Sequence, residues 1–216
     1  MNLHMTDIVN KRPLCVDLDK TLVREDVFRS ALLSWALRGF RPWNGFPPAS
    51  RNGFKSWIYQ NINLVSIEWH FNAEVISLIC RARKDLRPVI LVTGNSEEAG
   101  NFFAKEIPCI TSILTSTENL TLKGRRKAIE LQTLFGLNNF DYIGDSKVDI
   151  PVWEVCYQAF ILTYPNRTYH KIMKKLQDRE PHPVFLDFGE VDLLQLTSTP
   201  GATDLEVSTV GCSCLK

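Results

Sequence analysis

The sequence lacks a long hydrophobic run, a strong net charge and the ligand spacing of a zinc site. No stretch approaches the roughly 18 consecutive apolar residues that a membrane span needs. The first residues lack the apolar core of a signal peptide, so we expect a cytoplasmic protein without a transmembrane segment. The net charge of +1 gives no argument for nucleic acid, and we expect none to be bound. The 4 histidines and 6 cysteines show no zinc-site spacing.

What the sequence does contain is an alternation of short apolar runs with amphipathic stretches. The predicted strands are 13–19, 88–94, 110–116, 140–145 and 159–164, with a possible edge strand at 183–188. The predicted helices are 97–107, 124–136 and 167–177. In helix 124–136 the apolar residues Ile129, Leu131, Leu134 and Phe135 recur near helical spacing. This order predicts an α/β fold with a mainly parallel sheet covered on both faces.

One region interrupts the alternation between the first two predicted strands. Residues 24–86 have helical patterning and include Trp35, Trp43, Trp57 and Trp69. A normal crossover between strands needs far fewer residues. We therefore predict a core of 1–23 and 87–190, with 24–86 as a small helical insertion after strand 1. The Ser/Thr-rich tail, 191–216, is expected to be poorly ordered.

Polar residues follow several of the predicted strands, where an open parallel sheet carries its sites. Strand 1 ends in Asp17 and Asp19, and strand 2 ends in Thr93, Gly94 and Asn95. The remaining members of the set are Lys123, Asp145 and Asp149. Converging carboxylates repel one another unless a cation lies among them, and hard oxygen ligands suit Mg²⁺. A lysine and a hydroxyl beside such a metal can hold a phosphoryl group. A calcium loop does not fit, because Thr21 and Leu22 stand where that pattern needs an acid or Asn and then Gly.

Four segments, in order, resemble the motifs of the haloacid dehalogenase (HAD) superfamily, whose core is Rossmann-like. They are "VDLDKTLV", "ILVTGN", "LTLKG" and "YIGDSKVD", and the resemblance covers roughly residues 13 to 165. It implies Asp17 as nucleophile and Mg²⁺ ligand, and Asp19 as general acid/base with its backbone carbonyl on the metal. It implies Asp145 as a further Mg²⁺ ligand, and Asp149 as a residue that supports the metal either directly or through another ligand.

The same resemblance implies that Thr93, Gly94 and Lys123 bind the phosphoryl group. Lys123 is preferred over Lys127, one helical turn further on, for the position beside Asp17. Lys20 departs from the Gly most common in the first motif, and we expect its side chain to point to solvent. The insertion 24–86 would be a cap that closes over the substrate.

The implied activity is a phosphatase that hydrolyses a small phosphomonoester through an aspartyl-phosphate. A phosphotransferase or mutase using the same intermediate is the alternative enzyme. "TLKGRRKAIEL" and "FDYIGDSKVDIPVWEVC" also resemble the phosphatase-like domain fused to UbiA-type polyprenyltransferases. This closer resemblance implies a stand-alone or truncated relative, with a membrane prenyltransferase as a possible partner. It leaves open a sugar phosphate or a lipid-linked phosphate as substrate, and a non-catalytic partner module as the function of another class.

Overall fold

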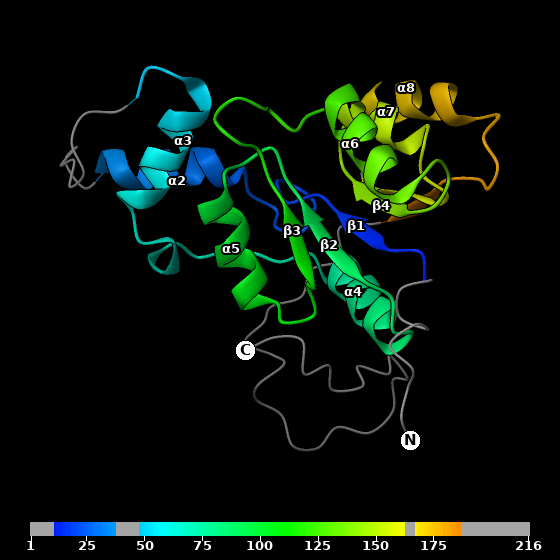
Figure 1. Cartoon of the computed structure of the whole chain (residues 1–216), viewed down its shortest axis with the longest axis horizontal. Coiled ribbons are helices and arrows are strands. Elements are labelled where there is room, and N and C mark those ends of the chain that lie inside the picture. Colours follow the sequence, from blue (N-terminus) through cyan, green and yellow to red (C-terminus); the bar gives the residue numbers. More distant parts are fainter. Residues whose placement is uncertain (1–10, 38–47, 163–166, 187–216) are drawn as a thin grey trace.

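A computed structural model describes residues 11–37, 48–162 and 167–186 (Figure 1). Within these residues, 6 strands form one sheet in the order β3-β2-β1-β4-β5-β6. Every neighbouring pair is parallel. The strands are β1 (Leu14–Val16), β2 (Val89–Val92), β3 (Ser112–Leu114), β4 (Asp141–Gly144), β5 (Ala159–Leu162) and β6 (Val184–Leu186). The predicted α/β fold is therefore confirmed, and the sheet is parallel throughout its described part.

The strands are short apolar runs because both faces of the sheet are covered. Val89–Val92 is a run of buried β-branched and aliphatic residues, which is typical of a central parallel strand. Leu14 and Val16 of β1 belong to one buried cluster, whereas Cys15 belongs to the other. The strand order reverses at β1: β2 and β3 follow on one side of it, and β4, β5 and β6 lie on the other. The carboxyl end of β1 is therefore the place where an open α/β sheet carries its ligand site.

The helices divide between the two faces of the sheet. On one face, α4 (Ala73–Lys84) and α5 (Glu97–Glu106) share a cluster with Leu14 and Val16. On the other, α6 (Arg125–Phe135), α7 (Ile150–Trp153) and α8 (Arg167–Leu176) share a cluster with Cys15. The predicted helices 97–107, 124–136 and 167–177 are confirmed, with ends that differ by at most one residue.

The inserted region contains α2 (Val27–Leu37), α3 (Arg51–Gln60), the 3₁₀ turn η1 (Leu64–Ser66) and α4. Figure 1 shows α2 and α3 side by side, apart from α6 and α7. Trp35 of α2 packs edge-on against Trp57 of α3, with ring centroids 5.4 Å apart. Helix α4 instead contacts β2, so it covers the sheet. The assignment of residues 24–86 as a cap stays a prediction. Within this range, α2 and α3 lie beside the carboxyl ends of the strands, whereas α4 packs on the sheet.

Parts of the predicted organisation lie outside the described residues. These are the first ten residues, Trp43, and the predicted tail 191–216. Among the helices that the structure describes, none combines the length and apolarity needed to cross a bilayer.

Candidate active site

Asp17 lies directly beyond β1, at the centre of the sheet. Its backbone N–H donates to the carbonyl of Ile143 in β4 across 3.0 Å, which extends the ladder by one residue. The chain then turns, because the Asp17 carbonyl accepts from the N–H of Leu22 at 3.2 Å. Leu18 and Leu22 are fully buried, so the turn is anchored in the core. This packing fixes the Asp17 carboxylate at the carboxyl end of β1.

Three carboxylates meet at this point. Within the described residues, oxygens of Asp17, Asp145 and Asp149 lie within 4.8 Å of one another. Asp145 follows β4, and Asp149 ends the 3₁₀ turn η2 (Lys147–Asp149). The Asp149 carboxylate caps that turn by accepting from the backbone N–H of Ser146 at 3.3 Å. A side-chain carbon on Gly144 would lie 3.0 Å from Asp149, so a glycine here permits the close approach.

Lys127 of α6 contacts two of these three acids. Its Nζ donates to Asp17 Oδ1 at 2.9 Å and lies 3.7 Å from Asp149 Oδ1. It also donates to the hydroxyl of Tyr142 at 2.8 Å, and that hydroxyl donates to Asp149 Oδ1 at 2.9 Å. The side chain of Lys127 is only 4% exposed. Lys127 and Tyr142 therefore hold the acids in a fixed, buried arrangement.

The electrostatics of the site favour an additional cation. Burial raises the pKa of Asp17 to about 7, an effect that the nearby Lys127 partly offsets. Burial and the charges of Asp17 and Asp149 raise the pKa of Asp145 to about 8. One ammonium therefore does not neutralise the group. Three carboxylate donors in one place are the ligand set that Mg²⁺ prefers, so Asp17, Asp145 and Asp149 fit a magnesium ion.

Asp19 has a different environment from Asp17. Its carboxylate accepts from the backbone N–H of Val27, at the start of α2, and from the side-chain amide of Asn95, each at 2.8 Å. It is not a member of the three-carboxylate group, because the turn after Asp17 directs it toward Asn95. Burial raises the pKa of Asp19, although the Val27 hydrogen bond opposes the shift. Its predicted backbone contact with a metal stays a prediction.

Asn95 joins Asp19 to the inserted helix α3. The Asn95 side-chain oxygen accepts from Lys55 Nζ at 3.1 Å and from the hydroxyl of Tyr59 at 3.0 Å. Lys55 is only 6% exposed, and its Nζ lies 3.4 Å from the carbonyl of Gly94. Burial and the nearby charge of Lys123 lower the pKa of Lys55. A buried polar network therefore runs from α3 to the predicted general acid.

The predicted phosphate-binding residues lie at the end of β2. Thr93 is fully buried, and its hydroxyl accepts from the backbone N–H of Asn95 at 3.1 Å. A side-chain carbon on Gly94 would lie 2.7 Å from Cε of Lys123, so the lysine crosses directly over the glycine. Lys123 is exposed, and it is Lys127 that contacts Asp17. The structure therefore brings Lys123 to Gly94 and brings Lys127 to Asp17.

The sequence contained one usable signal for Lys127. The buried face of α6 consists of Lys127, Ala128 and Leu131. Ile129 and Leu134, which made the helical pattern convincing, are 53% and 55% exposed. A lysine on the stripe that contains Ala128 and Leu131 indicates a buried ion pair. Asn95 was among the polar residues predicted at the end of strand 2, although without a role. Lys55 and Tyr142 had no comparable signal, because their contacts join segments distant in the sequence.

The position of Lys20 explains the usual glycine of the first motif. Its φ is 57°, in the left-handed region that glycine enters without a steric cost. Its side chain is exposed, as predicted. The Lys20 charge nevertheless acts on Asp145, whose pKa it lowers against the larger effect of burial.

Sequence comparison finds a relative that matches part of this chain's length, but no family model. No model of a protein family matches the chain. The uncharacterized protein y4nM of Sinorhizobium fredii is 26% identical over 187 residues, which are 81% of this chain and 35% of that protein. The chain therefore spans about a third of the length of this relative.

Two crystal structures have the same arrangement. The HAD family hydrolase t0658 of Salmonella enterica serovar Typhi superimposes with a TM-score of 0.51 and 11% identity, over 77% of this chain and 71% of that one. A predicted phosphoglycolate phosphatase of Haemophilus somnus does so with a TM-score of 0.53 and 14% identity, over 88% and 99%. The chain therefore has the Rossmann-like fold of HAD-type hydrolases.

Proposed function

We propose that the chain is a phosphatase of the HAD type, which hydrolyses a phosphomonoester through an aspartyl-phosphate on Asp17. The observation that carries this proposal is the 2.9 Å contact between Lys127 and Asp17 inside a group of three carboxylates. The fold shared with HAD-type hydrolases supports it. We assign to Lys127 the place beside Asp17 that the motif comparison gave to Lys123.

The residues divide the reaction between them. A carboxylate oxygen of Asp17 attacks phosphorus, and the bond from phosphorus to the substrate oxygen breaks. Asp19, whose pKa is raised by burial, gives a proton to the leaving alcohol oxygen. The resulting Asp19 carboxylate then takes a proton from water, which attacks phosphorus and releases Asp17 and inorganic phosphate.

The surrounding groups orient and stabilise these steps. Asp17, Asp145 and Asp149 would hold Mg²⁺, which supplies positive charge to the phosphoryl oxygens when bound. Thr93 and the backbone of Gly94 lie where the phosphoryl group would be held, and Lys123 extends over that place. Lys127 opposes the effect of burial on the pKa of Asp17 and orients its carboxylate by a hydrogen bond.

Release of phosphate from an aryl phosphate tests the proposal. We expect turnover in Mg²⁺, loss of turnover in a chelator, and loss of at least about 10³-fold in Asp17→Asn, because the nucleophile is gone. Asp85→Asn, at the exposed end of α4, is the matched control and should behave as wild type. Activity of Asp17→Asn near the wild-type rate would exclude the proposed intermediate.

Two finer assignments stay predictions within this proposal. A phosphotransferase would use the same site, and transfer of phosphate to an added alcohol would identify it. The prenyltransferase partnership, with or without catalysis by this chain, depends on the sequence resemblance alone. The cytoplasmic location also stays a prediction.

A further inference from the structure

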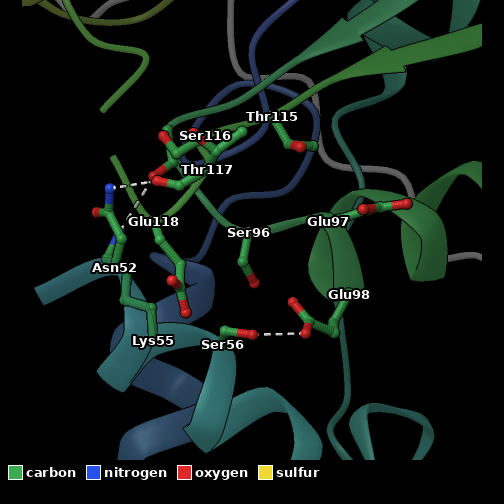
Figure 2. A pocket seen from close by; sticks show the side chains of 11 residues that line it. Asn52, Lys55, Ser56, Ser96, Glu97, Glu98, Thr115, Ser116, Thr117 and Glu118 are labelled. Carbon is green, nitrogen blue, oxygen red and sulfur yellow. Dashed lines mark hydrogen bonds between the residues drawn. The ribbon is translucent and has the colours of Figure 1, made fainter. Parts of the chain in front are cut away.

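A cavity of about 200 Å³ lies beside the network that holds Asp19. Its walls come from α3, from the segment between β2 and α5, and from the segment after β3 (Figure 2). The lining residues are Asn52, Lys55, Ser56, Gly94, Ser96, Glu97, Glu98, Thr115, Ser116, Thr117 and Glu118. Figure 2 shows Ser56 of α3 facing Glu98 and Asn52 of α3 facing Thr117.

The lining contains no aliphatic and no aromatic residue. Ligand pockets are usually lined mainly by apolar side chains, with a few polar groups that fix orientation. Hydrocarbon placed here would strip water from hydroxyl, amide and carboxylate groups without replacing their hydrogen bonds. The cavity is also smaller than the roughly 300 Å³ at which pockets for drug-sized ligands begin. It therefore fits a small molecule rich in hydrogen-bonding groups.

Hydrogen bonds between the walls hold the cavity in shape. The Asn52 side chain donates to the carbonyl of Thr117 at 2.7 Å, which ties α3 to the segment after β3. Ser56 and Gln60 of α3 both donate to Glu98 Oε1, at 2.5 and 2.7 Å, which ties α3 to α5. The cavity is therefore formed before any ligand enters, which lowers the cost of binding.

The cavity adjoins the place proposed for the phosphoryl group. Gly94, at the end of β2, lines both. Lys55 also lines the cavity, and its Nζ contacts Asn95, whose side chain binds Asp19. A phosphomonoester with its phosphoryl group at Gly94 would thus have its alcohol portion within reach of this space. This step rests on the proposed phosphatase function.

The charge of the lining limits which alcohol is suitable. Glu98 and Glu118 contribute two carboxylates, since the Glu97 side chain points away from the other labelled side chains in Figure 2, whereas Lys55 contributes one ammonium that already binds Asn95. The hydrogen bonds from Ser56 and Gln60 lower the pKa of Glu98, which keeps it ionised at neutral pH. A second carboxylate on the ligand would be repelled. Hydroxyl or amino groups would find acceptors.

We propose that this cavity receives the leaving alcohol of the substrate, and that the substrate is the phosphomonoester of a small polyol or amino alcohol without a second negative charge. Prenyl phosphates are disfavoured by the small volume and by the lack of aliphatic and aromatic residues in the lining, and carboxylated phosphomonoesters are disfavoured by its charge.

Relative kcat/KM values on matched substrates test this inference. Glycerol phosphate and 3-phosphoglycerate are a matched pair, because a hydroxymethyl group in one replaces a carboxylate in the other. We expect glycerol phosphate to exceed both 3-phosphoglycerate and farnesyl monophosphate by about tenfold or more, a ratio that such contacts commonly produce. Higher kcat/KM for either of the latter would overturn the inference.

The variant Glu118→Lys isolates the effect of charge. Glu118 is exposed, so the substitution leaves the core intact. We expect it to lower the ratio of glycerol phosphate to 3-phosphoglycerate by about threefold or more. Glu106→Lys, nine residues along α5 from Glu97 and far from the cavity, should leave the ratio unchanged. An unchanged ratio in Glu118→Lys would count against the cavity as the alcohol site.

An aryl phosphate measured in parallel separates the two proposals. Turnover of the aryl phosphate with the wrong preference in the panel would overturn only the inference about the alcohol. Failure of the folded protein to hydrolyse any of the substrates in Mg²⁺ would overturn the phosphatase function and this inference with it.

Discussion

Lys127 donates a hydrogen bond to Asp17 at 2.9 Å from a position that is almost completely buried. Lys123, one turn earlier on the chain, is exposed and crosses over Gly94. The two lysines therefore differ in what they can do, and substitutions of each should separate their roles.

Lys127→Met should lower kcat by about 10²–10³, because it removes a preorganised cationic donor at the proposed nucleophile. Lys123→Met should lower kcat/KM by about tenfold or less, since an exposed cation contributes only about 1 kcal/mol. Steady-state kinetics of both variants, with circular dichroism to verify folding, would decide. A larger kcat loss in Lys123→Met would restore the assignment made from the motif.

The raised pKa values of Asp17 and Asp145 predict how pH affects the metal-free protein. Both carboxyls bind protons more tightly when folded, with pKa values of about 7 and 8, than the ordinary value of 3.8. The folded state therefore binds more protons than the unfolded state between these values, and stability falls as pH rises from about 4 to 8. The proposed Mg²⁺ would bind the ionised carboxylates, so its stabilising effect should increase over the same range.

Thermal unfolding at pH 6 and pH 8, each with a chelator or with Mg²⁺, measures this linkage. We expect the rise in Tm caused by Mg²⁺ to be larger at pH 8. Asp145→Asn should reduce that difference, because it removes one of the two carboxyls that must lose a proton. An equal Mg²⁺ effect at both pH values would be inconsistent with metal binding at these acids.

Tyr142→Phe tests the bridge between Lys127 and Asp149. The Tyr142 hydroxyl accepts a hydrogen bond from Lys127 and donates one to Asp149, and Tyr142 is fully buried. Its removal should cost about 1–3 kcal/mol of unfolding free energy, because both partners lose a buried hydrogen bond. Chemical denaturation measures this cost, and Tyr157→Phe, at a tyrosine 40% exposed, should change it by less than about 0.5 kcal/mol.

Asn95→Ala should affect the rate more than the apparent affinity. The substitution removes the link from Asp19 to Lys55 and Tyr59, so the proposed general acid loses its orientation. We expect kcat to fall by about 10- to 100-fold with a smaller change in KM, together with a shift in the pH profile of kcat. Asn101→Ala, on the exposed side of α5, is the control. A change confined to KM would show that Asn95 serves binding rather than proton transfer.

Substitution of Asp141, at the amino end of β4, should affect stability more than the catalytic rate. It is 2% exposed, pairs with Arg12 at 2.9 Å and with Arg87, and accepts from the backbone N–H of Gln158. Asp141→Asn should lower the unfolding free energy by about 1–3 kcal/mol, less than a fully buried pair because the Arg12 side chain is partly exposed. The kcat of the folded fraction should stay near wild type.

The sequence predicted the strands and the residues that follow them because both are local features. An apolar run such as Val89–Val92 is typical of a buried strand. Asp17, Thr93 and Asp145 each follow such a run directly. Which face of α6 is buried could not be predicted from local sequence. It depends on packing against Phe140 and Trp153, which buries Lys127 and leaves Ile129 exposed.

The direction of Asp19 was also inaccessible from the sequence. An extended chain would place Asp17 and Asp19 on the same side. The hydrogen bond from Leu22 to Asp17 closes a turn instead, and Asp19 meets Asn95, 76 residues later in the chain. Likewise, α4 had the composition of the insertion that precedes it, and only its contact with β2 assigns it to the sheet.

The strand β4 carries an acid at each end, and their fates differ. Asp141 at the amino end is neutralised by two arginines of the same chain, whereas Asp145 just past the carboxyl end lies among other acids. The charge of Asp141 is neutralised when the chain folds, whereas the proposed Mg²⁺ would neutralise that of Asp145. A screen of variants along this one strand would therefore sort into those that change how long the protein survives and those that change what it does while folded.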